Sequence, residues 1–187
     1  MVYLPPPHLA DDRRSYLEAY KDILTSHRRS PLSSASSVIM LVAPNVDALC
    51  ASKMFARLFK LDDVIYSIIP ISGLNEFEER INELKPNTTV GIVILSTCRT
   101  DYAQQQLHTL LLINMAGQTD LPRANWFGEF EEHVTFHVID SIRPLSLDNL
   151  FMGNRIFVWD DGGAKTVEDE LKESWEIVTV CFHMPWY

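Results

Sequence analysis

The fold is decided by residues 38–53, which read VIMLVAPNVDALCASK. The first five residues are all apolar, and an unbroken run of this length is typical of a strand buried on both faces of a sheet. Pro44 and Asn45 end the run, and apolar residues then recur at helical spacing from Ala48 to Leu61. The stretch therefore predicts a buried strand, a turn and a helix, with Asp47 at the strand-to-helix turn.

Apolar runs and segments of helical periodicity alternate along the rest of the chain. One helix is expected around Tyr16–Leu24, and another from about Asn75 to Leu84. Strands that alternate with helices favour parallel pairing through crossover connections. We therefore predict the α/β class, with a mostly parallel sheet and helices on both faces. The other strands are expected at Val64–Ile71, Val90–Leu95, Leu110–Met115, Val134–Ile139 and Arg155–Trp159.

The composition is that of an ordinary globular domain, because 47% of the 187 residues are hydrophobic and 22% are charged. The formal net charge of −9 opposes nucleic-acid phosphates, so a general DNA-binding surface is excluded. We expect a soluble protein without a membrane span or a secretion signal. Its expected parts are an N-terminal helical segment at 1–30 that packs on the same domain, an α/β domain at 31–175 and a divergent tail at 176–187.

Polar side chains stand at the ends of three predicted strands. Asn45 and Asp47 follow the first strand, Asn114 lies at the end of a later apolar run, and Asp140 follows Val134–Ile139. Ligands of parallel α/β sheets bind at this carboxyl edge. Two aspartates and two amides carry too little negative charge to hold two divalent cations. We therefore predict no metal, no cofactor and no catalytic residue here.

Each of these residues also has a structural interpretation, which the sequence leaves open. Asp47 could cap the backbone donors at the start of its helix, and Asn45 could be an ordinary turn residue after proline. Asp140 could end its strand and pair with Arg143. Other chemistry has no recognisable motif, because the sequence shows no Gly-rich phosphate loop, no nucleophile elbow and no histidine pair at ligand spacing.

Several segments, in order, resemble the family of cell division cycle protein 45. This resemblance implies kinship with the RecJ-like phosphoesterases, which are named for their Asp-His-His motif and bind catalytic metal through these segments. It places Asn45, Asn114, Ser141 and Ile142 where metal-binding groups would stand, while Asp47 and Asp140 remain. The remnant of the superfamily site that it implies consists of Asn45, Asp47, Asn114, Asp140 and Arg143. The segments that carry the resemblance are 42–53, 68–73, 111–117, 138–144 and 159–162.

Membership of that family would imply a role without catalysis. The expected function is a non-catalytic subunit of the replicative helicase in the nucleus, needed to start replication and to move the fork. The implied partners are the MCM ring and the GINS complex, with chromatin and single-stranded DNA reached through the complex and no membrane. The alternatives are a metal-dependent phosphoesterase or exonuclease of the RecJ-like superfamily, and an α/β module that senses a nucleotide.

Two segments depart from the family pattern. Residues 90–109 look like an insertion, and residues 176–187 break away where the family continues into an acidic stretch and a much longer chain. Our hypothesis is that both are translated from retained introns, in which case this chain is a truncated form. Transcript reads that cross both segments without splicing would support a real protein instead.

Overall fold

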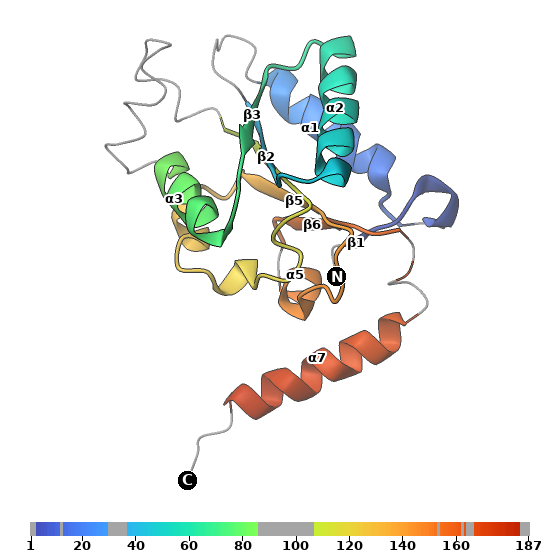
Figure 1. Ribbon diagram of the computed structural model, residues 1–187. Helices are drawn as coiled ribbons and strands as arrows, with labels where there is room; N and C mark the ends of the chain where they lie inside the picture. Colours follow the sequence, from blue (N-terminus) through green and yellow to red (C-terminus); the bar gives the residue numbers. More distant parts are fainter. Residues whose placement is uncertain are drawn as a thin grey trace.

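A computed structural model describes residues 3–11, 13–29, 37–85, 107–152, 154–161, 163 and 167–183. Its centre is a six-stranded sheet in the order β1-β6-β5-β4-β2-β3, in which every pair of neighbouring strands is parallel (Figure 1). The predicted α/β class is therefore confirmed. The strands are β1 (Tyr3–Leu4), β2 (Val38–Val42), β3 (Tyr66–Pro70), β4 (Thr109–Ile113), β5 (Thr135–Ile139) and β6 (Ile156–Trp159).

Helices cover both faces of the sheet, as the alternation of elements predicted. On one face, α1 (Tyr16–Arg29) and α2 (Val46–Leu61) lie side by side (Figure 1). On the other face lie α3 (Leu74–Leu84) and α5 (Leu147–Phe151), with α7 (Glu168–His183) packed against α5. Short 3-10 turns complete the described elements at η1 (Pro7–Leu9), η4 (Leu121–Arg123) and η5 (Phe127–Glu129).

The sheet separates two apolar cores, because successive side chains of a strand point to opposite faces. In β2, Met40 packs with Phe55 and Phe59 of α2, whereas Leu41 packs with Phe77 of α3. Every residue of β2 and of β4 is buried, which is why β2 and the last four residues of β4 are continuously apolar.

The structure contains elements that the sequence prediction missed, and other predictions fall on residues that it does not describe. The strand β1 was missed, because two residues before a run of prolines carry no periodicity that could reveal it. The helix α7 was also missed, and it passes through residue 176 without a break. The predicted strand Val90–Leu95 and the polar segment 101–106 lie outside the described residues.

The topology places a crevice at the carboxyl ends of β2 and β4. These strands are neighbours, but the chain proceeds from β2 to β3 on one side and from β4 to β5 on the other. Such a switch point is where ligands bind in open parallel sheets, because the connections diverge and leave a gap.

In the part of the chain that the structure describes, no helix has the length and apolar character needed to cross a bilayer.

Candidate functional site

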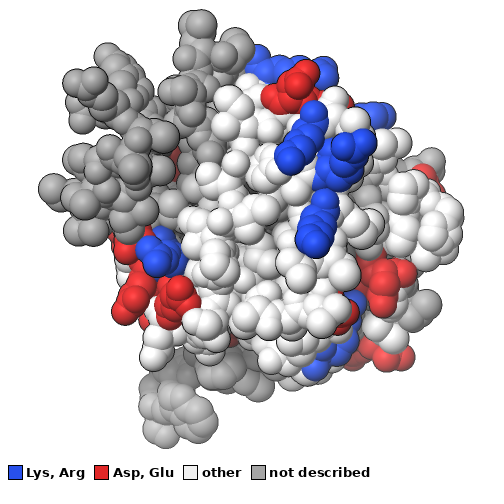
Figure 2. Space-filling view, turned by 45° about the horizontal axis from the view of Figure 1, so that its top comes forward, with Lys and Arg blue, Asp and Glu red and all other residues white. Residues whose placement is uncertain are grey.

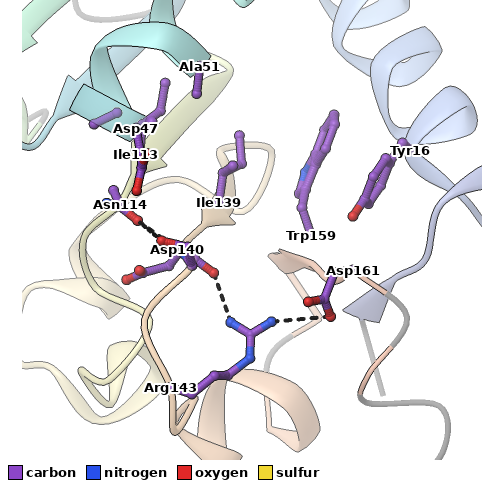
Figure 3. Close-up of a pocket in the computed structure, with 12 residues that line it drawn as sticks. Tyr16, Asp47, Ala51, Ile113, Asn114, Ile139, Asp140, Arg143, Trp159 and Asp161 are labelled. Carbon is purple, nitrogen blue, oxygen red and sulfur yellow. Dashed lines mark hydrogen bonds and ion pairs between the residues drawn. The ribbon is translucent and has the colours of Figure 1, made fainter. Parts of the chain in front are cut away.

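A cleft of about 310 Å³ opens at this carboxyl edge (Figure 3). Most of the residues predicted to form the site meet there, since Asp47, Asn114, Asp140 and Arg143 all line it. Ser141 lines it as well, and Tyr16 and Trp159 form an aromatic wall. Asn45 is not part of the lining, and Ile142 lines a second hollow of about 200 Å³ on the other side of Asp140. The sequence therefore predicted the carboxyl edge of the sheet as the place of the site, but not all of the residues that line the cleft.

Asn45 is the N-cap of α2. Its backbone is extended, and its side-chain Oδ1 accepts a hydrogen bond of 2.8 Å from the amide of Ala48. An Asn at this position satisfies one of the donors that a helix start leaves open. The structure thus corrects the capping role considered for Asp47, which lies one residue into the first turn and is exposed. Asp47 remains a carboxylate on the rim of the cleft, near the positive end of the helix dipole.

Asn114 fastens the loop after β4 to the loop after β5. Its Oδ1 accepts from the backbone amide of Ser141 at 3.1 Å and from the hydroxyl of Ser141 at 2.8 Å. The backbone of Asn114 has a φ of 55°, a left-handed conformation that Asn tolerates better than most residues. Both acceptor sites of the amide oxygen are therefore engaged inside the protein.

Asp140 holds two backbone amides with its carboxylate. Oδ2 accepts from Gly117 at 3.0 Å, and Oδ1 accepts from Ile142 at 2.9 Å. The residue is 8% exposed, so these amides stand in for water around the charge. Gly117 is required by close approach, because a Cβ added there would lie 2.7 Å from Oδ2 of Asp140.

Arg143 does not pair with the carboxylate of Asp140, which corrects one of the sequence interpretations. Its Nη1 donates to the backbone carbonyl of Asp140 at 2.9 Å. Its Nη2 lies 3.4 Å from Oδ1 of buried Asp160. The same atom lies 3.5 Å from Oδ1 of exposed Asp161 (Figure 3). Arg143 therefore links the loop after β5 to the loop after β6 and offsets two of the acids around the cleft.

The aromatic wall is fixed by polar contacts behind it. The Tyr16 hydroxyl donates to the backbone carbonyl of Asp160, and its ring stacks on Trp159 with a centroid separation of 4.8 Å. Burial, helped by the nearby charges of Asp160 and Asp161, raises the pKa of Tyr16 to about 12, so the hydroxyl stays protonated. Trp159 in turn donates through Nε1 to Nδ1 of buried His137 at 3.0 Å.

The sequence analysis missed two buried polar residues of α5, the first of which supports the site. Buried Asn149 of α5 accepts from the amide of Leu121 at 3.0 Å and donates to the carbonyls of Ala116 and Thr119, and so shapes the loop that carries Gly117. Its neighbour Asp148 accepts from Trp175 of α7 at 2.9 Å. The sequence did offer a signal, because two adjacent polar residues stand between apolar residues in the segment 147–151. Polar groups that are buried need hydrogen-bond partners, so such a pair indicates a structural role.

The arrangement does not suit a two-metal centre. Within the described ranges, no group of three or more His, Cys, Asp or Glu side chains is placed to hold a metal ion. The oxygens of Asn45, Asn114 and Asp140 already accept hydrogen bonds from the protein, and only Asp47 offers a further carboxylate from the predicted set. Two divalent cations need several anionic ligands to offset their mutual repulsion. The residues present therefore do not fit such a group.

The fold and the cleft together define a doubly wound α/β protein whose polar groups at the carboxyl edge are turned inward to hold loops. A family model described as CDC45 matches residues 38–182, so the chain belongs to the CDC45 family. The cell division control protein 45 homologue of Schizosaccharomyces pombe is 30% identical over 164 residues, which cover 87% of this chain and 22% of that protein. Cell division control protein 45 of Saccharomyces cerevisiae is 32% identical over 174 residues, which cover 86% and 23%.

A solved structure supports the same fold. The crystal structure of CDC45 from Entamoeba histolytica superposes with a TM-score of 0.59 at 18% identity, covering 85% of this chain and 25% of that one. This superposition confirms the predicted α/β fold. The chain spans less than a quarter of the length of the curated relative from fission yeast. The family match reaches residue 182, into the segment 176–187, while the domain boundaries and the insertion at 90–109 stay predictions.

Proposed function

We propose that the chain is part of a non-catalytic subunit of the eukaryotic replicative helicase and acts in the nucleus with the MCM ring and the GINS complex. The observation that carries this proposal is made on the cleft of a member of the CDC45 family: Asn114 and Asp140 hold backbone amides of neighbouring loops. The resemblance to the RecJ-like enzymes implies that metal-binding groups would stand at these positions. A carboxylate that organises loops contributes to a fixed docking surface, which is what an assembly subunit requires.

The charge of the chain supports assembly through protein contacts. With a net charge of −9, the chain lacks the electrostatic attraction that non-specific DNA binding depends on. Contact with chromatin and single-stranded DNA is therefore proposed to pass through the complex. The names of the relatives, cell division control proteins, agree with a role in DNA replication and the cell cycle.

Affinity capture tests this function. We expect the tagged chain to retain purified MCM ring and GINS subunits above the level of a tag-only control, with the full-length relative as the positive reference. An Asp47→Ala variant is expected to retain both equally well, since the proposed role uses no metal ligand. Failure to retain either assembly would mean that this chain lacks the replication role.

The second candidate function is a metal-dependent phosphoesterase, and the exposed carboxylate of Asp47 on the cleft is the observation in its favour. We expect no cleavage of single-stranded DNA or of a small phosphodiester when Mn²⁺ or Mg²⁺ is added to the purified chain, because the remaining ligand charge is too small. Turnover that appears with metal and disappears in both Asp47→Ala and Asp140→Ala would establish the enzyme instead.

A further inference from the structure

The outward side of α2 carries large apolar side chains that nothing in the described part of the chain covers. The inward side of the helix already makes its contact with the core, since Ala48, Phe55 and Phe59 pack there. Apolar residues on the opposite side therefore add nothing to the core. These outward residues are between 42% and 74% exposed, and they are Val46, Leu49, Met54, Leu58 and Leu61.

Three cations lie among these apolar side chains. Lys53, Arg57 and Lys60 are exposed, and their spacing of four and three residues places them along one side of the helix. No ion pair joins any of the three to another described residue within 4 Å. Figure 2 shows basic side chains in a row across an otherwise uncharged surface over α2. We call the five apolar residues and these three cations the α2 face.

The acids of α2 and of the two residues that follow it lie at the ends of the helix. Asp47 is in the first turn and lines the cleft, whereas Asp62 follows the helix and accepts a hydrogen bond of 2.7 Å from Tyr20. Asp63 is exposed one residue further on. The middle of the face is thus positively charged, although the chain as a whole is strongly negative.

We propose that the α2 face docks an acidic segment of another protein that carries large aliphatic side chains. The aliphatic side chains of the segment would cover the apolar residues of the face, and its carboxylates would pair with the cations. Exposed apolar side chains gathered in this way mark interaction sites, and charge complementarity selects the partner and its register. This inference goes beyond the proposed replication role and does not depend on it.

A nucleic acid fits the α2 face less well than a protein segment. Binding of single strands combines a continuous basic groove with exposed aromatic rings on which bases stack. The α2 face has three cations and no exposed aromatic side chain, and the net charge of −9 repels a phosphate backbone. The interleaved aliphatic residues would stay uncovered against phosphates.

The test uses a defined probe. A synthetic helical peptide with leucine at positions i, i+3, i+4 and i+7 and glutamate between them is compared with a scrambled peptide of the same composition. Binding to the whole chain is followed by fluorescence anisotropy at two salt concentrations. We expect the ordered peptide to bind about tenfold more tightly than the scrambled one, because only its leucines form a stripe that matches the face.

Matched variants locate the binding. Replacing Lys53, Arg57 and Lys60 by glutamate is expected to weaken binding of the ordered peptide by about tenfold or more. The same reversal at Lys21, Arg28 and Arg29, which are exposed on α1, changes the net charge equally and should alter the affinity less than about twofold. A Met54→Asp variant should also weaken binding, since it breaks the apolar part of the face, and circular dichroism confirms that each variant is folded.

Three results would overturn the proposal. Equal affinity for the ordered and scrambled peptides would show that the α2 face recognises only the charge of the peptide and not the arrangement of its leucines. Tighter binding of a single-stranded oligonucleotide, lost in the charge-reversed variant of α2, would make the face a nucleic-acid site. A molecular mass that rises with concentration and falls in Met54→Asp would make the occupant a second copy of this chain.

Discussion

Replacing Asp140 by alanine is expected to lower the free energy of unfolding by about 3 kcal/mol, because two amide donors at a buried position lose a charged acceptor at once. The amides are those of Gly117 and Ile142, and the carboxylate that serves them is almost fully buried. Neither loop can easily turn its amide to water, since Asn149 and Arg143 fix the surrounding backbone. Urea unfolding followed by circular dichroism measures the change.

Asp47→Ala is the matched control, as it removes the other aspartate of the cleft. Asp47 is exposed, so we expect a change of less than about 1 kcal/mol, mostly from the lost interaction with the helix dipole. A loss for Asp47→Ala as large as that for Asp140→Ala would show that the two acids do the same work, and would remove the structural role assigned to Asp140.

Gly117→Ala probes the same contact from the other side. The added methyl group would meet Oδ2, Cβ and Cγ of Asp140 at 2.7 to 2.9 Å, and overpacking of this kind costs about 1–3 kcal/mol. In the Asp140→Ala background the contacts with Oδ2 and Cγ disappear and only the contact with Cβ remains, so the double variant should lose less than the sum of the two single losses. Strict additivity would mean that Gly117 and Asp140 do not meet in solution.

The helices and strands could be predicted from the sequence better than the hydrogen-bond partners of the residues at their ends. The strand at 38–42 and the helix after it were predictable because burial on both faces and helical periodicity are local signals. The positions of Asn114 and Asp140 at strand ends followed from the same pattern. Which donors they meet did not, because Asn114 and Ser141 are 27 residues apart and Gly117 and Asp140 are 23 apart. Such pairs depend on how the strands are ordered in the sheet.

The role of Arg143 shows the same limit. Its nearness in sequence to Asp140 favoured an ion pair between them, yet the side chain reaches the acids that follow β6. That choice depends on β6 lying beside β5, a fact of topology that the motif does not contain. The turn after β4 could likewise be recognised from Gly117, but the need for glycine arises from the carboxylate of a strand that comes later in the chain.

His137 is expected to make the protein sensitive to mild acid. The ring is buried, stacks on Phe157 with a centroid separation of 5.1 Å and accepts a hydrogen bond from Trp159, so it is held neutral. Burial, with a smaller effect of the positive charge of Arg14, lowers the pKa of His137 to about 3. In the unfolded chain a histidine titrates near 6.5. The unfolded state therefore binds more protons below this pH, and the stability that depends on the neutral ring is complete above pH 6.5 and is lost as the pH falls towards 3.

The measurement compares urea unfolding at pH 7.5 and pH 5.0 in the wild type and in His137→Gln. A titration from 6.5 to about 3 removes about 2 kcal/mol between these two pH values. The glutamine can still accept a hydrogen bond from Trp159 but carries no titrating ring. The variant should therefore lose less stability between the two pH values by that amount, although poorer packing makes it less stable at both.

Burial also lowers the pKa of His108, which adds to the loss of stability in both proteins, so the difference between them isolates His137. His8→Gln, at an exposed position in η1, serves as the control for the same residue change. Equal losses in wild type and His137→Gln would show that the ring can reach water and a proton while the protein stays folded.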